Sequence, residues 1–216
     1  MPLTREMVAG SGVSQDIKKL FFKLLADTEA DVTSSSTGAG TASGTGVVAA
    51  ESGLGGFHKT VLTLTNTPVT ITDDAGVAQY GGTGAVYVFP QGLVVPMGVV
   101  LTGNLTLGTT GTIIAAFTGV NAIGTATATT GATLTGTEAD ILPSTANATA
   151  SGSVAAIDSV SVATALTESG ARWLDGTATA KSMFLNFAIA DDATHTSGTG
   201  KFTGTIQFLW AIIGDN

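Results

Sequence analysis

The feature that most constrains the fold is a change in hydrophobic period close to His58. From there the segment KTVLTLTNTPVTIT, residues 59–72, alternates apolar residues with threonine. A period of two indicates a strand with one buried face, and the stiff, β-branched Thr and Val side chains fit a pleated sheet. We therefore expect residues 57–216 to form an all-β domain.

Similar short apolar runs recur along the rest of the chain. The candidate strands are 85–89, 92–101, 104–107, 112–118, 122–129, 132–135, 154–164, 182–190 and 201–213, and the candidate turns are 73–76, 80–84, 142–145 and 191–200. Many short strands with Gly-rich turns and no helical pattern between them favour an antiparallel sandwich or barrel. Only TEADIL, residues 137–142, suggests a brief helical turn.

One tract, YVFPQGLVVPMGVV at residues 87–100, is apolar on both strand faces yet contains two prolines. Residues 90–92 suggest a turn, and Pro96 predicts that its strand lies at an edge or is bulged there. A strand that is apolar on both faces is expected to be buried on both. One face would meet the opposing sheet, and the other would meet the N-terminal segment, a long loop or another subunit.

The N-terminal region, residues 1–32, is predicted to be an arm that carries an amphipathic helix. Ile17, Leu20, Phe21 and Leu24 recur at the spacing of one helical face. Residues 33–56 are rich in Ser, Thr and Gly, which is typical of a flexible linker. The arm would then dock on its own β domain or on a neighbouring molecule. Three lysines and no Trp in the helix argue against a membrane-surface role.

Charge and composition limit the partners. The net charge is −8, and only 11% of the residues are charged, against roughly a quarter in an ordinary domain. An acidic body repels phosphate, so nucleic-acid binding is not expected. A surface with few charges, covered by Thr, Ser, Gly and Ala, tends to associate. Cysteine is absent, and no apolar run reaches the length of a membrane helix.

No set of residues predicts catalysis, a metal or a cofactor. His58 and His195 are far apart, lack metal-ligand spacing, and are interpreted as surface or loop residues. The pairs at 73–74 and 191–192 are aspartates in predicted turns, where Asp is favoured without any metal. No nucleophile elbow or phosphate-binding loop is visible. Trp173 and Trp210 are expected to pack in the core or at an interface.

Three stretches together resemble a known family. YGGTGAVYVFPQGLVVPMGVVLTGNLTL at 80–107, TLTGTEADILPST at 133–145 and the closing segments LDGTATAKSMFLNFAIADD and GTGKFTGTIQFLWAIIGDN after residue 173 resemble tracts of capsid decoration (cement) proteins of tailed bacteriophages. The resemblance covers roughly residues 57–216 and excludes the arm.

That resemblance implies a jelly-roll-like β-sandwich without catalysis or cofactor, which assembles as trimers on the outer face of the capsid. We expect the major capsid protein as partner and a location in the virion, although the diversity of the family means that the resemblance does not itself give the partner. The N-terminal sequence lacks the apolar core of a signal peptide, which predicts synthesis in the host cytoplasm. The apolar arm residues and the tract then predict the contacts with capsid or neighbouring subunits, namely Ile17, Leu20, Phe21, Leu24, Val88, Phe89, Val94 and Val95. A head-fibre or tail-fibre receptor-binding protein is the alternative, although aromatic residues make up only 6% of the chain.

Overall fold

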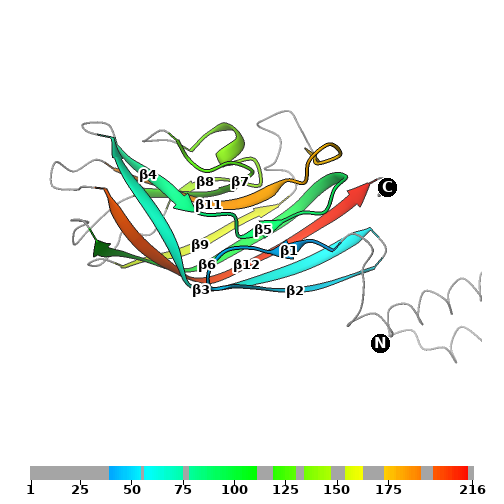
Figure 1. Cartoon of the computed structure of the whole chain (residues 1–216), viewed down its shortest axis with the longest axis horizontal. Helices are drawn as coiled ribbons and strands as arrows, with labels where there is room; N and C mark the ends of the chain where they lie inside the picture. The colour runs from blue at the N-terminus through cyan, green and yellow to red at the C-terminus, as the bar shows by residue number, and fades with distance from the viewer. Residues whose placement is uncertain are drawn as a thin grey trace, which may run out of the picture.

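The structure, a computed structural model, describes residues 39–54, 56–74, 78–110, 119–129, 134–146, 154–162, 173–190 and 197–213 (Figure 1). Most of these residues lie in antiparallel strands, so the all-β prediction is confirmed. Their one helical element is a short 3-10 turn, η1 (Gly136–Glu138), which overlaps the start of the helical turn that the sequence predicts at 137–142. The predicted helical arm lies outside the described residues, which contain no helix long and apolar enough to cross a membrane.

Twelve strands make up the described fold. They are β1 (Thr41–Ala42), β2 (Val47–Leu54), β3 (Phe57–Asp74), β4 (Ala78–Thr83), β5 (Tyr87–Val88), β6 (Leu93–Thr110), β7 (Gly119–Gly124), β8 (Leu142–Ala146), β9 (Val154–Val162), β10 (Leu174–Asp175), β11 (Ser182–Ala190) and β12 (Gly198–Ile213). Of these, β11 has the bounds that the sequence predicts, and β12 begins three residues earlier than predicted.

The strands form two layers that are joined by β3. In one layer β2, β3, β12 and β6 lie side by side, and β9 and β10 extend it beyond β6. In the other layer β11 lies between β4 and β7, and β8 follows β7. The first half of β3 pairs with β2, and its second half pairs with β4. The long strand thus passes from one layer into the other (Figure 1).

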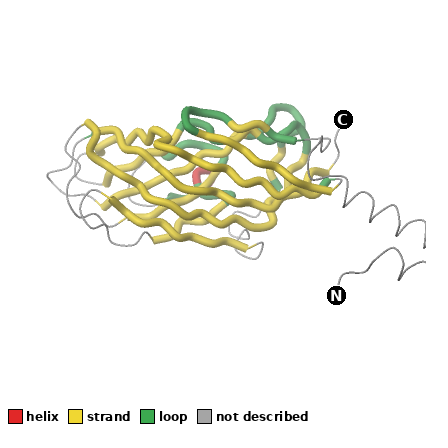
Figure 2. Tube along the Cα trace, turned by 90° about the horizontal axis from the view of Figure 1, so that it is seen from below, coloured by secondary structure: helices red, strands yellow, loops and turns green. Residues whose placement is uncertain are grey.

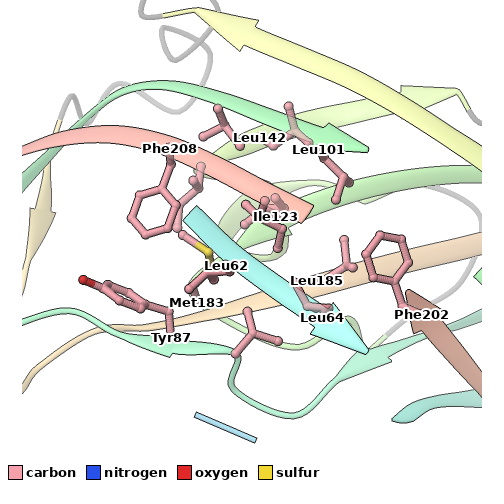
Figure 3. Packing of buried hydrophobic residues seen from close by; sticks show 14 of the residues in the cluster. Leu62, Leu64, Tyr87, Leu101, Ile123, Leu142, Met183, Leu185, Phe202 and Phe208 are labelled. Atoms are coloured by element: carbon pink, nitrogen blue, oxygen red, sulfur yellow. The ribbon is translucent and has the colours of Figure 1, made fainter. Parts of the chain in front are cut away.

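The hydrophobic core fills the space between the layers (Figure 3). Leu62, Leu64 and Phe208 come from the β3–β12 layer, and Ile123 and Leu185 come from the opposite layer. All five side chains are at most 3% exposed. Leu62, Leu64 and Phe208 alternate with exposed residues, as expected of a period-two pattern with one face in the core, whereas β7 and β11 are buried on both faces around Ile123 and Leu185.

The predicted bulge at Pro96 is confirmed. Leu209 of β12 lies opposite Gly98 of β6, but the next residue, Trp210, lies opposite Pro96, so Met97 is the extra residue of a bulge. On its other edge, β6 pairs with β10 before Pro96 and with β9 from Gly98 onward. Pro96 therefore sits in a gap between two ladders, where a residue without a backbone N–H is tolerated.

Three sequence predictions about local structure are wrong. Strands β1 and β2 fall in the range assigned to a linker, because β2 completes a hairpin with β3 despite its weak strand composition. The turn predicted at 80–84 is largely strand β4, where a Cβ on Gly81 would lie 1.9 Å from the Thr70 carbonyl oxygen. Glycine is needed there for the close approach of β3 and not for a turn. The turn predicted at 142–145 is strand β8.

A buried amide holds the connection between β7 and β8. The Asn186 amide nitrogen donates to the carbonyls of Ala126 and Glu138, both at 2.9 Å, and its Oδ1 accepts from Ala128 N at 3.0 Å. Asp140 in the same connection accepts two hydrogen bonds from Thr125. Burial outweighs these bonds and raises the pKa of the Asp140 carboxyl above its ordinary range.

Candidate functional site

The outer face of the β2–β3–β12–β6 layer carries an unusual set of exposed apolar side chains. Along these strands inward and outward residues alternate, so the outward set is defined by the burial pattern. The exposed large apolar side chains among the described residues all belong to this face: Val48, Phe57, Met97, Trp173, Leu209 and Ile213. Figure 2, seen from below, shows the long strands of this face running side by side.

Five of these six residues gather at one end of the face, and we call this group the outer patch: Phe57, Met97, Trp173, Leu209 and Ile213. Strand register brings them together. Ala211 of β12 lies opposite Phe57 on one side and Val95 on the other. Leu174 lies opposite Val94, and continuing that register places Trp173 beside Val95. Phe57 and Trp173 are thus at opposite margins of one row across the sheet.

The outer patch is hollowed. An open hollow of about 350 Å³ is lined by Phe57, Lys59, Met97 and Leu209, together with Ser52 and Gly53 of β2 and the neighbouring residues His58 and Trp210 of β3 and β12. Farther along the same face, outward positions carry threonine, and Thr102 and Thr205 share a hydrogen bond of 3.0 Å. The face therefore changes from apolar at one end to mostly uncharged and polar along its length, where Lys201 of β12 is an exposed charge. An apolar surface beside a polar one is typical of an association surface.

A polar cluster, centred on Glu51, lies on the inner side of the strands that bear the outer patch. The Glu51 carboxylate accepts from His58 Nδ1 at 2.8 Å, from Thr60 Oγ1 at 3.3 Å and from the Tyr87 hydroxyl at 2.5 Å. With the carboxylate ionised, Nδ1 of His58 must be the donor. Three elements, β2, β3 and β5, are therefore joined through one side chain that is 12% exposed.

Trp210 extends this cluster to the central strand β12. Its Nε1 donates to Thr60 Oγ1 at 3.0 Å, and its ring stacks on the His58 imidazole with centroids 4.0 Å apart and an interplanar angle of 12°. Nε2 of His58 is buried and has no hydrogen-bond partner among the described residues. The prediction that His58 is a surface residue is wrong: it occupies an inward position in phase with Leu62 and Leu64.

Tyr87 connects the cluster to the start of the described chain. The backbone N–H of Gly40 donates to the Tyr87 hydroxyl at 3.0 Å, and β1 pairs with β5 directly afterwards. A Cβ at residue 40 would lie 2.2 Å from that hydroxyl oxygen, so only glycine fits. Burial, followed by the hydrogen bond and negative charge of Glu51, raises the pKa of Tyr87 well above its ordinary value.

His58, Thr60 and Tyr87 of this cluster are buried and Glu51 is 12% exposed, so the cluster joins the strands beneath the surface. Its chemical effect is to fix the inner side of β3 and β12, whose outer side carries Phe57 and Leu209. The outer patch is therefore a surface on a rigid support. The described residues contain no group of three or more His, Cys, Asp or Glu side chains that could hold a metal ion.

The residues predicted as interface contacts are only partly at the surface. Phe89 and Val94 are 2% and 0% exposed, so they belong to the chain's own core and the interface prediction is wrong for both. Val88 and Val95 are half-buried and lie in different layers. The arm residues Ile17, Leu20, Phe21 and Leu24 lie outside the described residues, as does His195.

The tract at residues 87–100 has one face in the core and the other largely open. Val94 and Val99 point inward, whereas Val95 and Met97 point outward, and Met97 is 41% exposed. Of the two tryptophans, Trp210 is in the core as predicted, and Trp173 is 54% exposed. The outer patch could have been recognised from parity, because Phe57 and Leu209 share the strand phase of outward threonines.

Comparison of the chain with protein-family models, with curated proteins and with solved structures gives no match.

Proposed function

We propose that this protein is a structural virion protein that decorates and stabilises the outer face of a bacteriophage capsid. The observation that supports this function best is the outer patch, a rigid apolar surface on an otherwise acidic chain. Such a surface favours stable association with other proteins over turnover of a substrate. We propose the capsid as the partner because residues 57–216 resemble capsid decoration proteins.

The proposal includes a jelly-roll-like arrangement of the two layers, assembly as trimers and an N-terminal helical arm. In this proposal the arm binds the major capsid protein through Ile17, Leu20, Phe21 and Leu24. Full burial of each such side chain contributes about 1.5–3 kcal/mol, and ordering the arm opposes this by about 1–2 kcal/mol per residue. Each arm is therefore a weak ligand, and several arms on one oligomer bind strongly together.

The experiment uses phage heads that lack the protein. Purified full-length protein is mixed with these heads, and bound copies are counted after sedimentation. We expect saturable binding and an increase in the temperature at which heads rupture. The variant F21D/L24D should bind far less while keeping its far-UV circular dichroism. If the protein stayed in the supernatant at every concentration, the proposal that it binds the capsid would be wrong.

A receptor-binding fibre protein is the second candidate, and exposed Trp173 and Phe57 are the observation that favours it. Aromatic side chains stack on sugars, and these two lie three strand spacings apart, about 14 Å, across one face. This function predicts that the protein purifies with fibres and binds host glycans. Co-purification with isolated heads and no glycan binding would exclude it.

A further inference from the structure

The outer patch has an exposed charged residue at each of two opposite margins, and the partly buried Lys181 also acts on one of them, Asp175, through its positive charge. Lys59 lies on β3, where it is opposite Leu209, and Asp175 lies on β10, where it is opposite Leu93. Both side chains are exposed and point outward. Asp175 is the only carboxylate at this end of the face among the described residues. Because the rest of the chain is acidic, the electrostatic repulsion between two copies is expected to be smallest where this end of the face makes the contact.

These two charges cannot pair within one molecule. Three strand spacings and about four residues along β12 separate them, which corresponds to roughly 20 Å. An ion pair requires the nitrogen and oxygen to be within about 4 Å of each other. Lys59 and Asp175 therefore carry opposite charges at opposite margins of the outer patch, and they can pair with each other only between two molecules.

The Asp175 carboxylate is also held in place. Its Oδ1 accepts from the Thr177 backbone N–H at 3.1 Å and from the Thr177 hydroxyl at 2.7 Å. These hydrogen bonds lower the pKa of Asp175, so the group is ionised at neutral pH. A fixed carboxylate loses little side-chain freedom when it meets a cation, which favours its use in a contact.

We propose that the outer patch is the contact between copies of this chain, in which Lys59 of one copy faces Asp175 of the next. The apolar residues between these margins would be covered by the same contact. Exposed Phe, Trp, Met and Leu with charges confined to the margins are the composition of an interface centre with a polar rim. The inference rests on the proposed function for the claim that copies assemble, but its test needs no capsid.

This contact explains why the tract at 87–100 has an open outward face in the single chain. Val95 and Met97 lie in the centre of the outer patch, between the margins defined by Trp173 and Phe57. Both a two-fold pair and a closed ring can bring the β10 margin of one copy to the β3 margin of another. The mass of the assembled species then gives the number of copies.

The test measures self-association of the full chain by sedimentation velocity over a range of concentrations. We expect an oligomer for the native chain and a dissociation constant at least about tenfold weaker for F57S or W173S. V48S is the matched control, since Val48 is 66% exposed on the same face but lies outside the outer patch, opposite Thr63. V48S should associate like the native chain.

Charge reversal tests the pairing itself. K59E places two carboxylates in contact and should weaken association about tenfold; D175K should do the same with two ammonium groups. The double variant K59E/D175K restores opposite charges and should recover native association. D175N keeps the acceptor for Thr177 and should weaken association less than D175K, which controls for local damage.

Three results would overturn the proposal. The native chain could sediment as a monomer throughout, F57S and W173S could associate as well as V48S, or K59E/D175K could associate no better than K59E alone. Failure of capsid binding with a normal oligomer would instead reject the proposed function and leave this contact standing.

Discussion

Replacing Glu51 with alanine should cost a large part of the stability of the fold. The change removes the acceptor for His58 Nδ1 and the Tyr87 hydroxyl, and it removes the longer bond from Thr60 at 3.3 Å. Each buried donor left without a partner costs about 1–3 kcal/mol. Two such donors give about 2–6 kcal/mol, and because water can enter beside the partly exposed site we expect a loss of about 3 kcal/mol.

Urea unfolding, followed by circular dichroism, measures this loss as a change in the free energy of unfolding. E138A is the matched control, because Glu138 accepts one exposed local hydrogen bond from Thr135; it should cost no more than about 1 kcal/mol. E51Q keeps the side-chain shape but presents an amide to several donors, so it should fall between these two variants.

A double-mutant cycle with Y87F tests whether Glu51 is the centre of the cluster. In the native background Y87F removes the acceptor of Gly40 N and one donor to Glu51, at a cost of about 1–2 kcal/mol. In the E51A background the same change should cost less, because the hydroxyl has already lost its acceptor, with a coupling of about 1 kcal/mol. Our reasoning would be refuted if E51A cost less than about 1 kcal/mol or if the two changes were additive.

Three further predictions concern other buried polar groups. Folding raises the pKa of the Tyr87 hydroxyl, so its contribution to the free energy of unfolding is fully present below pH about 10. Above that pH the unfolded chain loses the proton first, and the free energy of unfolding should fall by about 1.4 kcal/mol per pH unit. Y87F should lack this slope when urea unfolding is repeated at alkaline pH. N186A should cost about 3 kcal/mol in urea unfolding, since one buried and two partly buried backbone groups lose their partner. D140N should be at least as stable as the native chain at neutral pH, where the raised pKa of Asp140 disfavours its charged form, whereas D140A should be less stable by thermal melting.

Sequence periodicity predicts much of this fold because burial on one sheet face imposes it directly. The β3 segment and the first part of β12 alternate, and β11 is apolar except for Ser182 and Asn186, so the pattern identifies these strands. Strand β2 has no such signal, since its sequence VVAAESGL has the composition of a linker. Its place in the sheet comes from its partner β3, and pairing between segments is not encoded in local propensity.

The site was less predictable, because it depends on which strands become neighbours. The most apolar tract predicts an interface, but Phe89 and Val94 of that tract are buried in the core because they are strongly hydrophobic. Phe57 is a single apolar residue and Leu209 lies within the apolar run at 208–213, and only strand register brings them and Trp173 to one face. The burial of His58 follows from strand alternation: it lies four residues before Leu62 and six before Leu64, on the same inward face of the strand. Residue type alone predicts a surface position for a histidine.

The position of β12 has a consequence for synthesis of the protein. This strand lies between β3 and β6 along most of its length, yet it follows both of them in the chain by more than eighty residues. A ribosome makes about 5–20 residues per second. Several seconds therefore pass between the synthesis of β6 and that of β12, the strand that pairs with both β3 and β6. A nascent chain truncated before β12 therefore has two long unpaired edges and no completed sheet, and interrupted translation should yield material for proteolysis and not partly functional subunits.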